Sequence, residues 1–122
     1  MKTVIMHIQD LNEKVLKKLN QQHMPIAFPT ETVYGLGAPY DDETTIFNVF
    51  VLKGRPLNNP LIVHVSSQEM MLPLVKDMHE DAKHLITHFF PGPLTLIMKK
   101  SDQVSSLVTA GQNTVGIRMP NH

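Results

Sequence analysis

Short apolar runs along the chain alternate with stretches in which apolar residues recur every three or four positions. The short runs, rich in β-branched residues, predict strands at residues 3–8, 26–28, 61–65, 94–98 and 114–118. The longer spacing predicts helices over residues 10–20, 41–53 and 77–90, a shorter helix after residue 66 and a short helical turn at 104–108. Strands that alternate with helices predict an α/β layered fold.

Polar residues at two of the predicted helix starts are candidate caps. Asp10 and Glu13 have the spacing of a capping box, and Ser66 and Glu69 repeat it. Pro73 follows the second pair closely and limits or kinks that helix, because proline cannot donate a backbone hydrogen bond. We expect the first helix to be capped at Asp10 and the short one at Ser66.

The composition is that of a globular protein without a strong net charge. Of 122 residues, 42% are hydrophobic and 18% charged, which indicates one folded domain over residues 1–122. Lys plus Arg and Asp plus Glu both number 11, so net charge provides no general attraction to nucleic acids or membranes. The absence of cysteine excludes disulfides and thiolate chemistry. With neither an apolar run of roughly 20 residues nor a signal-peptide core, we expect a soluble cytoplasmic protein.

The stretch after residue 28 is the strongest candidate for a binding site. Pro29 ends the preceding strand, hydroxyl-bearing residues follow, and Gly35 and Gly37 allow backbone amides to approach a ligand. Lys53 and Arg55 supply two cations on a later segment, at a helix exit and in a loop. Together these features indicate a site for a phosphate or a carboxylate.

The same residues have a structural interpretation when each is taken alone. Gly35 and Gly37 lack the third glycine of a dinucleotide fingerprint and the Gly-Lys-Ser/Thr of a P-loop, so a simple turn is equally compatible with them. Isolated cations such as Lys53 and Arg55 are most often solvated surface charges. Only their combination with a recognisable motif favours the binding site.

Histidines offer two further candidates. A lone His64 in an apolar strand is most often structural, but alternation along residues 61–65 places it opposite the apolar face, where it can point at a site. His84 and His88 lie four apart and could share a helix face, which raises the possibility of a metal site. Neither has an obvious third ligand in the sequence, so we interpret them as solvated helix surface and predict no metal site.

Five ordered motifs carry a family resemblance: residues 29–37, 53–56, 59–65, 91–95 and 114–118. Read as Pro-Thr-Glu-Thr-Val-Tyr-Gly-Leu-Gly, Lys-Gly-Arg-Pro, Asn-Pro-Leu-Ile-Val-His-Val, Pro-Gly-Pro-Leu-Thr and Thr-Val-Gly-Ile-Arg, they resemble the YrdC/Sua5 family of threonylcarbamoyl-AMP synthases. The resemblance implies an α/β (mixed α+β), three-layer YrdC-like domain with a twisted, mostly mixed β-sheet flanked by helices. Family members continue into a Ser-x-Asn segment and further strands, so we expect the domain to be incomplete at its C-terminus.

The resemblance also implies roles for particular residues. The cations expected to act in catalysis are Lys53 and Arg55. The residues expected to hold L-threonine are Thr32, His64 and Arg118, with Arg118 paired to its carboxylate. The residues expected to contact ATP are Arg55, Asn59 and Thr114. Thr114 and Arg118 lie four apart in one predicted strand, so their side chains should share a face.

The reaction implied by the family consumes L-threonine, bicarbonate and ATP, with Mg²⁺ accompanying the nucleotide. It forms threonylcarbamoyl-AMP and pyrophosphate, and other proteins use the product to modify an adenosine of tRNA (t6A37). No Ser-His-Asp triad is apparent, and this reaction does not require one. Holding the reactants in line can supply roughly 7 to 11 kcal/mol of the barrier.

Three alternatives stay open at the level of sequence. The first is a YrdC-like module that binds double-stranded RNA or tRNA without catalysis, although no stripe of Lys and Arg favours it. The second is a carbamoyl-transfer domain of the hydrogenase-maturation type, which would belong to a longer chain with zinc-finger and acylphosphatase-like regions. The third is a folded but inactive remnant of a synthase.

Overall fold

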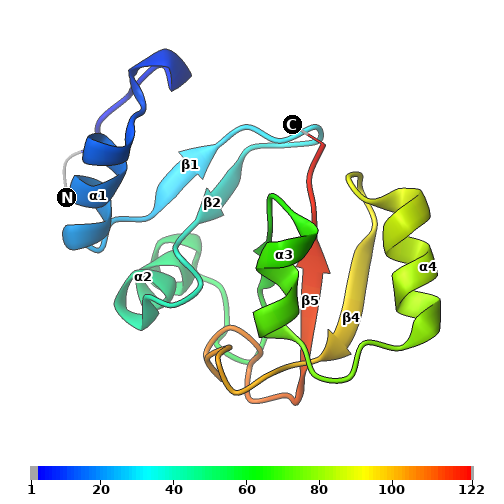
Figure 1. The fold of residues 1–122 in the computed structure, drawn as a ribbon. Helices are drawn as coiled ribbons and strands as arrows, with labels where there is room; N and C mark the ends of the chain where they lie inside the picture. The colour runs from blue at the N-terminus through cyan, green and yellow to red at the C-terminus, as the bar shows by residue number, and fades with distance from the viewer. Residues whose placement is uncertain (1–2, 122) are drawn as a thin grey trace.

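The computed structural model describes residues 3–121, and its strands form two separate sheets (Figure 1). In the first, β1 (Ile26–Phe28) and β2 (Gly35–Gly37) pair as an antiparallel hairpin. The second has the order β3 (Ile62–His64), β5 (Thr114–Arg118), β4 (Thr95–Lys99). Strand β5 runs parallel to β3 and antiparallel to β4, so the predicted mixed sheet is confirmed.

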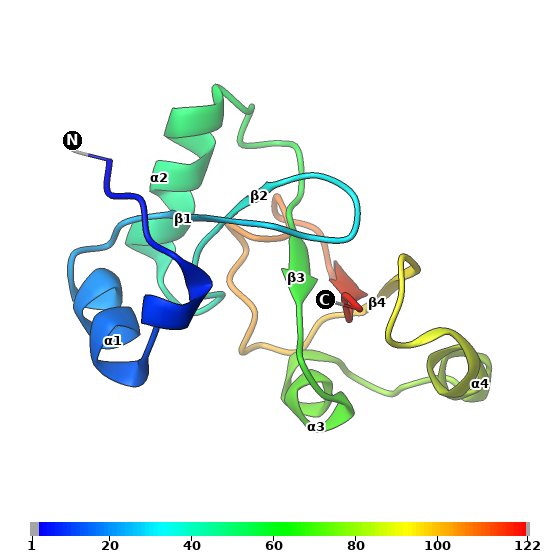
Figure 2. The same cartoon turned by 90° about the horizontal axis from the view of Figure 1, so that it is seen from above.

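Helices precede β1 and fill the intervals between β2 and β3 and between β3 and β4. The α-helices are α1 (Glu13–Gln21), α2 (Glu43–Lys53), α3 (Gln68–Met71) and α4 (Glu80–Phe89), and two short 3-10 helices are η1 (Ile8–Asp10) and η2 (Leu72–Leu74). Figure 2 shows α3 and α4 on one side of the three-stranded sheet and the hairpin on the other, with α2 toward the β3 edge of the sheet, away from β4. The arrangement confirms the predicted α/β fold with helices flanking a sheet. Within residues 3–121, the helices are all too short or too polar to span a bilayer.

One face of the three-stranded sheet forms the core. Its side chains come from alternate positions of β3 and β5, and they pack with apolar residues of the helices: Val63, Val65, Val115, Ile117, Ile46, Phe50, Met71, Leu74, Ile86 and Phe90. Ile117, in the central strand, is 0% exposed. The opposite face, with Ile62, His64, Ile97 and Arg118, carries no fully buried residue. The core therefore anchors the sheet while leaving that face available to ligands.

Helix α2 begins and ends where the sequence predicts. Asp42 caps it, because its carboxylate accepts hydrogen bonds from the Thr45 backbone N–H (3.1 Å) and hydroxyl (2.6 Å). These bonds, the Thr45 hydroxyl above all, lower the pKa of Asp42 to about 2. Gly54 ends the helix in the left-handed conformation, at φ 60°. Lys53 and Arg55 consequently lie at a helix exit and in the following loop.

The prediction of a strand at residues 3–8 is wrong. This segment is irregular until η1 begins at Ile8, and Ile5 is 93% exposed. No strand within residues 3–121 pairs with it, so its apolar, β-branched residues have neither a ladder nor a core to stabilise an extended conformation. Strand β1 forms as predicted but is only partly buried. Residues 104–108, where a short helical turn is predicted, form a bend and turns, and the Val108 backbone N–H donates to the Ser105 carbonyl at 3.1 Å.

The two helices predicted to be capped by Asp10 and Ser66 are capped by other residues. Helix α1 is capped by Asn12, whose side chain accepts from the Val15 backbone N–H at 2.9 Å, because Asp10 is used in η1. Helix α3 is capped by Ser67, which accepts from the Met70 backbone N–H at 3.3 Å, rather than by Ser66. Sequence spacing locates a helix start, but the local backbone decides which oxygen reaches the free N–H groups.

Candidate ligand-binding site

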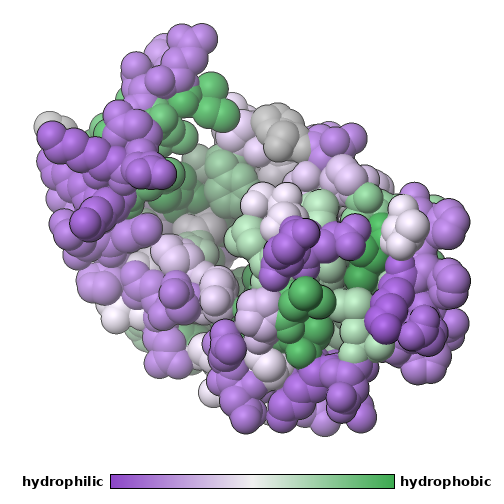
Figure 3. Space-filling model, viewed as in Figure 1, coloured by the Kyte–Doolittle hydropathy of each residue, from purple (hydrophilic) through white to green (hydrophobic). Residues whose placement is uncertain are grey.

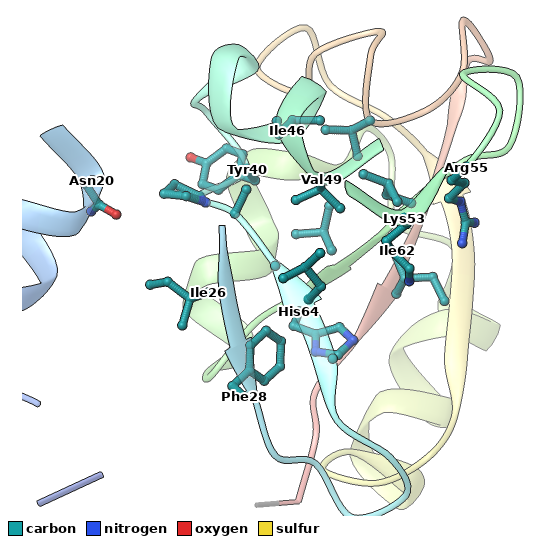
Figure 4. A pocket seen from close by; sticks show the side chains of 18 of the residues that line it. Asn20, Ile26, Phe28, Tyr40, Ile46, Val49, Lys53, Arg55, Ile62 and His64 are labelled. Carbon is teal, nitrogen blue, oxygen red and sulfur yellow. The ribbon is translucent and has the colours of Figure 1, made fainter. Parts of the chain in front are cut away.

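A cavity of about 530 Å³ lies between the hairpin, α2 and β3. Figure 3 shows hydrophobic side chains around a hollow beside the hydrophilic N-terminal part. Most of the wall is apolar and includes Ile26, Leu36, Tyr40, Ile46, Val49 and Val63. Three side chains that can carry positive charge also line it, namely Lys53, Arg55 and His64 (Figure 4). Such a mixture suits a ligand with an apolar part and an anionic part.

The two glycines of the hairpin make room for an aromatic ring of the protein. A Cβ added at Gly37 would approach Cε1 of Phe28 to 2.6 Å, and one added at Gly35 would approach its Cζ to 3.2 Å. Both residues belong to β2, and both also line the cavity. Close packing of Phe28 thus explains the glycines within the described structure.

Phe28 in turn lies against His64. Their ring centroids are 6.2 Å apart at an interplanar angle of 75°, an edge-to-face arrangement visible in Figure 4. As the alternation predicts, Val63 is buried and His64 points away from the core. Burial first, and then the positive charge of Arg118, lower the pKa of His64, while Glu31 acts in the opposite direction. A neutral imidazole at pH 7 can both donate and accept a hydrogen bond.

Arg118 is paired with a residue from the hairpin loop. Its Nη2 donates to Glu31 Oε1 at 2.5 Å, and its Nε donates to the Gly92 carbonyl at 3.3 Å. The side chains of Arg118 and Glu31 are 14% and 24% exposed. The pKa of Glu31 is lowered, first by a hydrogen bond to its own backbone N–H and then by Arg118. The predicted carboxylate clamp therefore already has one protein carboxylate beside it.

Arg55 is oriented by its own loop. Its Nη2 donates to Asn59 Oδ1 at 3.0 Å and to the Pro60 carbonyl at 2.6 Å, and its Nε donates to the Asn59 carbonyl at 3.3 Å. Within residues 3–121, neither Lys53 nor Arg55 forms an ion pair. The two cations therefore keep donors for an anionic ligand, and Arg55 is held in place to offer them.

Thr32 lies in the exposed loop between β1 and β2. The Thr30 hydroxyl shapes this loop, because it accepts from the Thr32 backbone N–H at 3.3 Å and donates to the Val33 carbonyl at 2.5 Å. The hydroxyls of Thr30 and Thr32 are 3.2 Å apart. Thr32 does not line the cavity, but its neighbour Glu31 brings the loop to Arg118.

The candidate residues fall into two groups at opposite ends of the strands. In the parallel pair, His64 is the register partner of Arg118, and both lie at the C-terminal ends. Thr114 begins β5, and the loop with Arg55 and Asn59 precedes β3, so these residues belong to the N-terminal ends. Thr114 and Arg118 are four positions apart in β5, which at about 3.3 Å per residue separates them by roughly 13 Å. The structure brings Thr32, His64 and Arg118 toward one end and Arg55, Asn59 and Thr114 toward the other.

The part of the chain that the structure describes contains no group of three or more His, Asp or Glu side chains that could hold a metal ion. His84 and His88 share α4, where His88 Nδ1 lies 2.7 Å from the His84 carbonyl oxygen. This contact engages one ring nitrogen of His88 with the helix backbone.

Comparison with known proteins identifies the family. The family model for Sua5, YciO and YrdC proteins, described as "Telomere recombination", matches residues 18–122. The chain belongs to this family. A threonylcarbamoyl-AMP synthase of Pyrococcus abyssi is 50% identical over 97 residues, which cover 80% of this chain and 28% of that protein. One from Bacillus subtilis is 47% identical over 105 residues, covering 85% of this chain and 30% of that protein.

A solved structure of a family member shares the fold. The crystal structure of P. abyssi Sua5 complexed with L-threonine matches with a TM-score of 0.84 and 45% identity, over 89% of this chain and 32% of that one. The chain thus spans about a third of the length of these relatives. The similarity confirms the YrdC-like fold expected from the motifs.

Sequence reasoning gave no role to three residues that contact the predicted ones: Phe28 lies against His64, and Glu31 and Gly92 accept hydrogen bonds from Arg118. Glu31 lies in the first motif and Gly92 in the fourth, while Phe28 immediately precedes the first motif. Some of their partners are distant, and Glu31 and Arg118 are 87 positions apart. Only the fold pairs a hairpin loop with the last strand.

Proposed function

We propose that this protein acts as an L-threonylcarbamoyladenylate synthase, which forms threonylcarbamoyl-AMP and pyrophosphate from L-threonine, bicarbonate and ATP. The observation that carries the proposal is that His64 lines one cavity together with Lys53 and Arg55, and that Arg118 is the register partner of His64 at the C-terminal ends of β3 and β5. The names of the P. abyssi and B. subtilis relatives support this activity, and the L-threonine complex of P. abyssi Sua5 supports the amino-acid substrate.

The amino-acid substrate would bind at the C-terminal ends of β3 and β5. Arg118 keeps guanidinium N–H groups beyond those that it gives to Glu31 and Gly92, and these can pair with the α-carboxylate. The neutral His64 and the hydroxyl of Thr32 would orient the hydroxyl and amino groups of threonine. Recognition by hydrogen-bonding groups favours threonine over an apolar amino acid of similar size.

ATP would bind toward Lys53 and the loop before β3. Arg55, held by Asn59 and Pro60, would meet the phosphates together with Lys53, while Asn59 and Thr114 would supply further polar contacts. Mg²⁺ would enter as the MgATP complex, bound to the phosphate oxygens of the substrate. The apolar wall of the cavity would receive the non-phosphate part of the nucleotide.

The chemistry needs two bond-forming steps. The threonine amine attacks bicarbonate to form a carbamate with loss of water, and a carbamate oxygen then attacks the α-phosphorus of ATP as pyrophosphate leaves. Lys53 and Arg55 would stabilise the charge that develops on the phosphates, a fixed electrostatic contribution that needs no protein nucleophile. We propose that the product serves t6A modification of tRNA by other proteins in the cytoplasm.

The deciding experiment is calorimetric titration with MgATP, with and without L-threonine and bicarbonate, followed by measurement of pyrophosphate in the same samples. We expect threonine-dependent ATP binding and pyrophosphate release. Thr32→Val should weaken L-threonine binding severalfold and leave ATP affinity unchanged. A folded sample that binds neither substrate, or that binds RNA in a salt-dependent manner without binding nucleotide, would refute the proposed function.

A further inference from the structure

Among residues 3–121, the Glu31–Arg118 pair is the side-chain ion pair that joins the hairpin to the three-stranded sheet. Glu31 lies in the loop between β1 and β2, whereas Arg118 ends β5 and is flanked by β3 and β4. Their Oε1 and Nη2 atoms are 2.5 Å apart, and both side chains are less than a quarter exposed. The pair is therefore better shielded from solvent than the lysine–carboxylate ion pairs of this protein. In one of these, Lys83–Glu80, the side chains are 55% and 75% exposed.

Apart from the Glu31 carboxylate, which also meets the Asn121 backbone, the hydrogen bonds of this loop lie within it. The Thr30 hydroxyl bonds to Thr32 and Val33, both in the same loop. Val33 and Tyr34 are 74% and 76% exposed, so the loop's larger side chains do not anchor it to the core. The contact between Glu31 and Arg118 therefore helps to fix the position of Thr32 relative to β5.

The same contact restricts Arg118. A free arginine side chain has many rotamers, and ordering it on binding a ligand costs conformational entropy. Here Glu31 holds Nη2 and the Gly92 carbonyl holds Nε, so two points define the plane of the guanidinium. The Nη1 donors and the second Nη2 proton remain for another acceptor.

We propose that Glu31 is a positioning residue for amino-acid binding, which orients the guanidinium of Arg118 and docks the Thr30–Thr32 loop beside it. The inference rests on the proposed function, because it concerns the carboxylate end of the L-threonine site. It assigns to Glu31 no contact with the reacting atoms. Arg55 and Lys53 lie away from this pair, so Glu31 should affect amino-acid binding and leave nucleotide binding unchanged.

The test is the affinity of Glu31→Gln and Glu31→Ala for L-threonine, L-threoninamide and MgATP. Glutamine keeps an oxygen that can accept from Arg118, so we expect its affinity for L-threonine to fall severalfold, and that of the alanine variant about 10-fold or more. The loss should be smaller for L-threoninamide, whose neutral amide depends less on Arg118. MgATP affinity should stay within about twofold. Glu80→Gln, which breaks the exposed pair with Lys83, is the matched control.

Three outcomes would overturn the inference. The first is unchanged L-threonine affinity in both variants. The second is tighter L-threonine binding, which would mean that Glu31 competes with the ligand for Arg118. The third is an equal loss of affinity for L-threonine and L-threoninamide, which would indicate a general structural defect.

Hydrogen exchange without ligand separates this inference from the proposed function. If Glu31 docks the loop, Glu31→Gln should accelerate exchange at residues 30–34 and leave α4 unchanged, whether or not the chain binds L-threonine. Unchanged exchange in the loop would contradict the docking role. A different result is also informative: the parent chain does not bind L-threonine, but loop exchange is faster in the variant. This result would count against the proposed function and against a role of Glu31 in amino-acid binding, but it would support loop docking.

Discussion

The sheet β3–β5–β4 buries one face against helices, whereas the hairpin β1–β2 and helix α1 contain no fully buried residue. The first region has a core that includes Ile117 at 0% exposure, and the second is joined to it through Phe28, Glu31 and the start of α2. The proposed ligand site lies where the two regions meet. Binding sites often combine a stable framework with a less stable segment, because ligand access requires some part to move.

This contrast indicates that stability and binding should respond to different substitutions. Substitutions in the sheet core should reduce the free energy of unfolding of the whole chain. Those in the hairpin should change local opening and ligand affinity more than global stability. Each of the following predictions tests whether effects on global stability and effects on ligand affinity come from different regions.

The largest effect on stability should come from Ile117→Ala. Removing three carbons from a completely buried side chain leaves a cavity, and such changes typically cost about 2 to 5 kcal/mol. The matched substitution in the other region, Leu16→Ala on α1, removes a side chain that is 40% exposed and should cost about 0.5 kcal/mol. Urea unfolding measures both. Equal costs would show that α1 is packed as firmly as the sheet.

Arg55→Ala should reduce ATP affinity about 10- to 100-fold, the range expected when a hydrogen-bonded charge pair is lost. Stability should change by only about 0.5 kcal/mol, because the side chain bonds only to its own exposed loop. Calorimetry and urea unfolding on the same samples measure both quantities, with Lys83→Ala as the control cation. A loss of stability equivalent to the loss of binding would argue against a role in the site.

Gly37→Ala should disturb the hairpin by about 1 to 3 kcal/mol, because its Cβ would lie 2.6 Å from the Phe28 ring. Gly35→Ala, at 3.2 Å, should be milder. Hydrogen exchange should increase in β1 and β2 and stay the same in β5. Adding Phe28→Ala should relieve part of the cost, so strictly additive effects would contradict this packing.

The smallest effect should be on the titration of His64. Arg118→Gln removes a positive charge that lowers the pKa of His64 and should raise that pKa, while Glu31→Gln should lower it further. NMR titration of the imidazole measures both shifts. Because the folded pKa lies below the usual value of about 6.5, this group's contribution to stability is complete above pH 6.5 and is lost as pH falls. A shift in the reverse direction would contradict the observed arrangement of charges.

Local signals in the sequence were sufficient for most elements of the fold. The acidic start and glycine end of α2 need only neighbouring residues, and alternation correctly placed Val63 inside and His64 outside. The ordered motifs identified the family because several short matches at defined positions rarely coincide by chance. The segment at residues 3–8 failed for the opposite reason: a strand requires a partner, and its own residues do not specify one.

What the sequence by itself determined is where most elements form, which face of β3 is apolar, and to which family the chain belongs, because these properties depend on residues close together in the chain. The tertiary structure alone decided that Phe28 occupies the space left by two glycines, and that Glu31 pairs with Arg118. It also decided that the candidate residues divide between the two ends of a parallel strand pair. Such contacts join residues as much as 87 positions apart, and only the register and packing of the folded chain bring those side chains together.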